Sequence, residues 1–119
     1  MHELTVTEHI LEIALRHGRE ANAARITDIY LVIGELSSYV DESVQFYWDF
    51  ISRNTMAEKA HLHFRRVPAR MLCLHCHQSF SPAAGLVCPH CGSAEVKITA
   101  GEEFYLEAID IEETEEVPI

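Results

Sequence analysis

Two Cys-x-x-Cys pairs, Cys73-Leu74-His75-Cys76 and Cys88-Pro89-His90-Cys91, contain all four cysteines of the chain. Thiolates at this spacing can converge on one tetrahedral ion, with sulfur ligands at about 2.3 Å. The eleven residues between the pairs are fewer than in most zinc ribbons but leave room for two short strands and a turn. Pro89 fixes φ in the second turn, and Gly92 can take a positive φ. The pattern predicts one structural zinc site with the ligands Cys73, Cys76, Cys88 and Cys91.

Two disulfides or a redox dithiol are the alternatives to zinc. Disulfides need an oxidising compartment, and the first eight residues lack the basic and apolar regions of a signal peptide. A thioredoxin-like site has one Cys-x-x-Cys at the start of a helix, whereas this chain has two among turn residues. Zinc in a cytoplasmic protein is therefore the favoured interpretation.

Composition limits the classes of partner. The chain has 119 residues, 48% of them hydrophobic, and no apolar run approaches the roughly 18 residues of a membrane span. The formal net charge is -10, and residues 101–119 carry eight acidic side chains and no basic one. Because such a charge repels phosphate backbones, we expect neither nucleic acid nor a membrane as partner.

Hydrophobic periodicity predicts helices over residues 4–22 and 41–54, and strands over residues 26–36, 60–67 and 103–111. Thr5 and Glu8 have the spacing of a capping box, and Asp41 is the expected N-cap of the second helix. The second helix is expected to bury one apolar stripe, which consists of Val44, Tyr47, Trp48 and Ile51 and is widened by Phe46 and Phe50.

This order of elements predicts an α+β fold. Two helices would pack on a three-stranded sheet, with a four-cysteine zinc-ribbon module inserted before the last strand. Residues 1–68 together with 99–111 would form the α/β domain, and residues 69–98 the zinc-binding domain. Residues 112–119 are acidic and lack periodicity, so we expect a disordered tail.

The start of the chain offers a second set of metal ligands. The Met1 amine, the His2 amide nitrogen and the His2 ring nitrogen Nδ1 can bind one ion in a plane, which suits Ni(II) or Cu(II) better than zinc. The fourth ligand stays open between Glu3 and a distant histidine: His75, His77 or His90. Any chain that begins Met-His offers the same nitrogens, so this signal has little specificity.

Four features together resemble the HypA/HybF family of nickel-insertion factors for [NiFe]-hydrogenase. They are Met1-His2-Glu3, the strand end Ile33-Gly34-Glu35-Leu36-Ser37, the aromatic helix after Asp41, and the paired Cys-x-x-Cys motifs. The resemblance, which covers residues 1 to about 111, implies a metallochaperone that delivers Ni²⁺. It further implies nickel binding by Met1, His2 and Glu3, and structural Zn²⁺ at Cys73, Cys76, Cys88 and Cys91.

The resemblance also implies partners, namely a HypB-type GTPase and the hydrogenase large subunit, and some members of the family serve urease as well. A homodimer is left open. In some members a histidine follows each cysteine pair, but here His77 follows the first pair and Gly92 the second. Whether histidine takes part in zinc binding is therefore left open too.

Other functions remain as alternatives. A zinc-ribbon interaction adaptor without nickel transfer is the main one, and a dithiol oxidoreductase is another. The sequence shows no nucleophile-base pair, no glycine-rich phosphate loop and no carboxylate constellation, so we expect no enzymatic activity. His61 and His63 are expected on an exposed strand face.

Overall fold

The computed structural model describes residues 3–114, which divide into two compact units. Residues 3–32, 38–65 and 105–114 form the helical unit, and residues 33–37 and 66–104 form the cysteine unit. The expected boundaries at residues 68 and 99 both fall within the cysteine unit. None of the helices that the structure describes is both long and apolar enough to cross a membrane.

Two helices belong to the helical unit: α1 spans Glu3–Glu20 and α2 spans Asp41–Ile51. The expected capping box is wrong, because α1 begins at Glu3 and Thr5 already lies inside its first turn. Asp41 is not the N-cap of α2 but its first helical residue, and Val40 precedes it without a side-chain cap. Asp41 still stabilises the helix start, since negative charge in the first turn complements the helix dipole.

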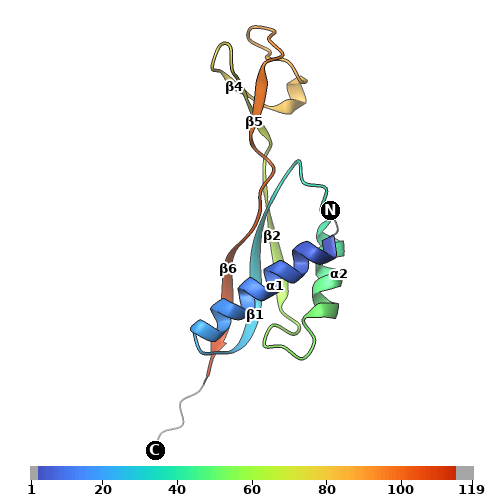
Figure 1. The fold of residues 1–119 in the computed structure, drawn as a ribbon, viewed down its shortest axis with the longest axis vertical. Coiled ribbons are helices and arrows are strands. Elements are labelled where there is room, and N and C mark those ends of the chain that lie inside the picture. Colours follow the sequence, from blue (N-terminus) through green and yellow to red (C-terminus); the bar gives the residue numbers. More distant parts are fainter. Residues whose placement is uncertain (1–2, 115–119) are drawn as a thin grey trace, which may run out of the picture. The chain divides into compact units, whose positions relative to one another are not determined.

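Three strands form the larger sheet: β1 (Ala23–Gly34), β2 (His61–Val67) and β6 (Phe104–Glu113), in the order β2-β1-β6. The Glu35 N–H donates to the Val67 carbonyl, so the ends of β1 and β2 meet and these strands are parallel. The Gly34 N–H donates to the Glu103 carbonyl beside the start of β6, so β6 is antiparallel. The predicted two helices and three-stranded sheet are confirmed, and α1 lies across the sheet (Figure 1).

The central strand β1 carries much of the core. Ile29, Leu31 and Ile33 on one face and Val32 on the other are each at most 1% exposed. Asp28 and Tyr30 on the second face are half-buried, so one face of β1 is covered and the other only partly. β6 continues to Glu113, two residues beyond its expected end, and Arg25 forms an ion pair with Glu112 at 2.6 Å. The rest of the expected tail, residues 115–119, lies outside the described part of the chain.

The expected core of α2 is only partly right. Trp48 is 0% exposed and Val44 1%, but Phe46 is 69% and Phe50 61% exposed. Successive helical residues are about 100° apart, so positions two residues before and after Trp48 point to the opposite side of the helix. A helix packed on one side buries only one stripe, and the two phenylalanines lie outside it.

The cysteine unit contains a second sheet with the order β4-β3-β5. Its strands are β3 (Arg70–Cys73), β4 (Ser79–Phe80) and β5 (Val96–Ala100), and a short 3-10 helix covers Pro82–Ala84. Both neighbours of β3 are antiparallel to it, with Met71 paired to Phe80 and to Ile98. Between the cysteine pairs the structure therefore has one strand and a 3-10 turn instead of the two short strands that we expected.

Gly34 lies where two backbones approach closely. A Cβ on Gly34 would come within 1.9 Å of the Gly101 carbonyl oxygen, and a Cβ on Gly101 would lie 2.8 Å from the Cα of Ala69. Gly101 also has φ +112°, which side chains rarely adopt. The Leu36 N–H donates to the Gly101 carbonyl at 2.8 Å. The glycine in the Ile33-Gly34-Glu35-Leu36-Ser37 segment is thus required by packing within the cysteine unit.

Candidate metal centre

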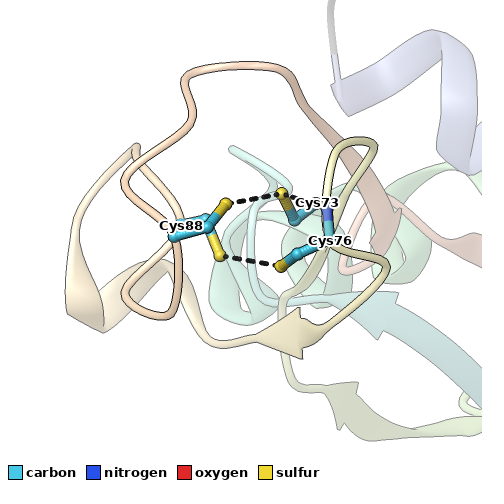
Figure 2. Close-up of side chains that lie close together, drawn as sticks. Cys73, Cys76 and Cys88 are labelled. Carbon is cyan, nitrogen blue, oxygen red and sulfur yellow. Dashed lines mark hydrogen bonds between the residues drawn. The ribbon is translucent and has the colours of Figure 1, made fainter.

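The four cysteine sulfurs form one cluster. All lie within 4.8 Å of one another, with Sγ–Sγ distances of 3.6 Å for Cys73–Cys91 and 3.5 Å for Cys76–Cys88. Figure 2 shows the sulfurs of Cys73, Cys76 and Cys88 turned toward one another. Tetrahedral ligands at about 2.3 Å from an ion are about 3.8 Å apart, close to the distances found. A disulfide would need a separation of about 2.05 Å, so these residues fit a bound ion and not two disulfides.

The first pair forms a tight turn at the end of β3. The His77 N–H donates to the Cys73 carbonyl at 3.0 Å, and the Cys73 N–H donates to the Gln78 carbonyl at 3.0 Å. The Cys76 N–H points at the Cys73 sulfur at 3.4 Å. This backbone hydrogen bond is the largest cause that lowers the pKa of the Cys73 thiol to about 6, which favours the thiolate that a metal requires.

The second pair repeats the same turn. The Gly92 N–H donates to the Cys88 carbonyl at 2.8 Å, the Cys88 N–H to the Ser93 carbonyl at 2.9 Å, and the His90 N–H to the Cys88 sulfur at 3.4 Å. Gly92 has φ +77°, as predicted. His77 holds the equivalent position in the first turn and has φ +64°. The two pairs are therefore two copies of one backbone structure that points amide groups at sulfur.

Burial differs among the four cysteines. Cys73 and Cys88 are buried, Cys76 is half-buried and Cys91 is exposed. Cys73 and Cys88 also belong to the core of the cysteine unit, together with Met71 and Phe80. A site closed by four thiolates has no open coordination position, which is the arrangement of a structural ion and not of a catalytic one.

His75, His77 and His90 lie next to the cysteines in the sequence but do not belong to the cluster. All three are exposed, and in residues 3–114 the only group of three or more metal-binding side chains with its donor atoms within 4.8 Å is the four cysteines. A role for any of these histidines thus remains a prediction.

Of the three residues expected to bind nickel, the structure describes only Glu3. Met1 and His2 lie outside the described residues. Glu3 is the first residue of α1 and is half-buried. Its carboxylate oxygen Oε2 is buried and has no hydrogen-bond partner within the described part of the chain. A carboxylate oxygen in this state can accept a hydrogen bond or bind a cation.

Comparison with known proteins adds the family. The family model described as hydrogenase/urease nickel incorporation, metallochaperone, hypA matches residues 1–111. This chain belongs to the HypA family. The predicted resemblance is confirmed, and with it the expectation of a metallochaperone and not an enzyme. The match includes Met1-His2-Glu3 and both cysteine pairs.

Individual relatives agree with the HypA assignment. The hydrogenase maturation factor HypA of Dehalococcoides mccartyi is 40% identical over 114 residues, covering 95% of this chain and 96% of that protein. The factor of the same name from Caldanaerobacter subterraneus is 38% identical, covering 94% of this chain and all of that one.

Solved structures agree in fold. The solution structure of the Ni metallochaperone HypA from Helicobacter pylori has a TM-score of 0.70 at 23% identity, with 96% of this chain and 100% of that chain covered. A second HypA solution structure has a TM-score of 0.74 at 24% identity, with 93% and 96% covered. At these identities the likeness shows the HypA fold alone.

Proposed function

We propose that the chain binds Ni(II) through Met1, His2 and Glu3 and delivers it to a [NiFe]-hydrogenase during maturation, with urease as a further recipient. Zn²⁺ at Cys73, Cys76, Cys88 and Cys91 has a structural role. The observation that carries this proposal is the family match over residues 1–111, which contains both sets of ligands.

Ligand chemistry assigns a different metal to each site. Four converging thiolates suit the tetrahedral preference of Zn²⁺ and stabilise it in a closed site. Ni(II) favours square-planar nitrogen and oxygen ligands, which the amine, amide and imidazole of Met1-His2 supply. The buried Oε2 of Glu3, which has no hydrogen-bond partner within residues 3–114, adds a carboxylate one residue away. Cargo and structural ion are thereby kept on separate ligands.

The terminal site also explains how nickel is released. The Met1 amine and the His2 imidazole must lose their protons before they bind metal, and their ordinary pKa values are about 8 and about 6.5. Nickel affinity therefore falls as the pH falls through this range. Three nitrogens from two consecutive residues bind a metal without enclosing it, so a recipient can approach the ion directly.

The proposed partners follow from the family alone. We propose a HypB-type GTPase and the hydrogenase large subunit as partners in the cytoplasm, because the chain belongs to the HypA family. The sequence of this chain has no glycine-rich phosphate loop of its own. GTP hydrolysis is accordingly assigned to the partner.

In the His2→Ala variant we expect the tight, near-stoichiometric binding of Ni(II) to be lost. The reason is that the His2 ring nitrogen Nδ1 is the third nitrogen of the proposed chelate. Residues appended before Met1 should have the same effect, since they convert the amine into an amide. Equilibrium dialysis against Ni(II), with zinc content measured on the same samples, checks both. His9→Ala is the matched control, because His9 is an exposed histidine of α1, and it should bind nickel normally.

Undiminished nickel binding in both modified proteins would overturn the terminal site. If the unmodified chain failed to bind Ni(II) at micromolar concentration, the adaptor function would be favoured instead.

A further inference from the structure

Two histidines of β2 lie side by side away from both candidate sites. His61 and His63 are two residues apart on one strand, so their side chains share a face of the sheet. Their ring centroids are 4.6 Å apart with an interplanar angle of 70°. His61 is exposed and the His63 side chain is 41% exposed. β2 is an edge strand of the sheet, so solvent reaches the pair from that side.

The His63 ring is held in place by β1. Its Nε2 lies 2.8 Å from Asp28 Oδ1, and the ring stacks on Tyr30 at 4.6 Å with an interplanar angle of 12°. Tyr30 is itself held by β6, because its hydroxyl donates to Asp110 Oδ2 at 2.6 Å. One imidazole of the pair is thus oriented by contacts to two other residues before any metal binds.

The hydrogen bond to Asp28 also selects the tautomer of His63. This bond is the largest cause that lowers the pKa of Asp28, which keeps the side chain a carboxylate that can only accept. In the neutral imidazole that metal binding requires, the hydrogen bond therefore places the proton on Nε2 and the lone pair on Nδ1. Histidines that bind metals commonly donate their other ring N–H to a carboxylate, which orients the ring and makes the free nitrogen more basic.

We propose that His61 and His63 form a second site for Ni(II), with Asp28 as the residue that positions His63. Two imidazoles at this spacing can bind one borderline divalent ion through a nitrogen each. The pair supplies two protein ligands and no third, because the four cysteines are the only group of three or more such donors within residues 3–114. Water fills the remaining coordination positions, so the site is weak and exchanges its ion readily.

The charges around the pair favour a cation. His61 lines a hollow whose other side chains include Asp41, Glu42 and Asp49 of α2. Of the two arginines that follow on β2, Arg65 is neutralised by Glu107 at 3.0 Å, and Arg66 donates to the Gly34 carbonyl at 3.3 Å. A purely structural role for the pair would not require His61, and a partly exposed hydrogen bond such as that between His63 and Asp28 contributes only modestly to stability. The site is independent of the ligands proposed at the start of the chain.

The test uses the full zinc-loaded chain with His2→Ala, so that the proposed terminal site is removed. Titrated with NiSO₄, this protein should show paramagnetic broadening of the amide signals of residues 28–30 and 61–63 first. Adding His61→Asn should weaken the residual nickel binding at least tenfold while the Asp28–His63 contact stays intact. Asp28→Asn should weaken it about tenfold, as expected for a residue that orients a ligand.

A matched control is His9→Asn with His17→Asn, two exposed histidines on α1, which should leave residual binding unchanged. Broadening centred elsewhere, or residual binding unaffected by His61→Asn, would overturn the second site. The two proposals fail in different experiments. The terminal site is tested by comparing nickel binding of the unmodified chain with that of His2→Ala alone, and the second site by the variants added to His2→Ala.

Discussion

In the Cys88→Ala variant we expect loss of bound zinc and unfolding of residues 69–98, while the helical unit keeps its structure. Cys88 is both a proposed zinc ligand and a member of the four-residue core of the cysteine unit, where it is 1% exposed. Besides the two proposed ligands Cys73 and Cys88, that core contains Met71 and Phe80. Zinc binding in small zinc modules is worth on the order of 10 kcal/mol, which is folding free energy of the module.

Zinc analysis and amide NMR check this expectation. Signals from the cysteine unit should collapse toward random-coil positions, and the far-UV circular dichroism of α1 and α2 should remain. His90→Ala, in the same turn but exposed, is the control and should keep its zinc. Loss of the entire circular dichroism signal in Cys88→Ala would contradict the division into two separately folding parts.

The Trp48→Ala variant should lose about 3–5 kcal/mol of unfolding free energy, because a fully buried indole is replaced by a cavity. The indole Nε1 has no hydrogen-bond partner among the described residues, so the loss is one of packing. Phe46→Ala, on the same helix but 69% exposed, should change the unfolding free energy by no more than about 0.5 kcal/mol.

Urea unfolding followed by circular dichroism at 222 nm measures both substitutions. An equal loss in Phe46→Ala and Trp48→Ala would show that Phe46 is covered in solution, against its exposure in the structure.

The metal centre was the part of the fold most fully specified by sequence. Spacing alone predicts that four thiolates converge, and Gly92 indicates the positive φ that its turn adopts. The positive φ of His77 could not be predicted in the same way, because histidine, unlike glycine, is not typical of that conformation. It becomes clear only when the two turns are compared in the structure. The strands β3 and β5 were missed as well, since four or five residues are too few to show a periodicity and their pairing joins segments about 25 residues apart.

The core and the histidine pair show a second limit of prediction from the sequence. Helical periodicity identifies Val44 and Trp48 correctly, but it cannot decide how wide the buried stripe is, because that depends on what packs against it. The sequence places His61 and His63 on one exposed face, yet Asp28 lies 35 positions from His63 and Tyr30 lies 33. Only the pairing of β1 with β2 brings these side chains together.

X-ray absorption at the zinc and nickel edges, on the chain loaded with one equivalent of each metal, tests the central claim most directly. We predict zinc surrounded by four sulfurs at about 2.3 Å, and nickel surrounded by nitrogen and oxygen with no sulfur, in a coordination shell that changes in His2→Ala. Sulfur scattering at the nickel edge, or a nickel shell identical in His2→Ala, would contradict the assignment of the two metals to separate sites.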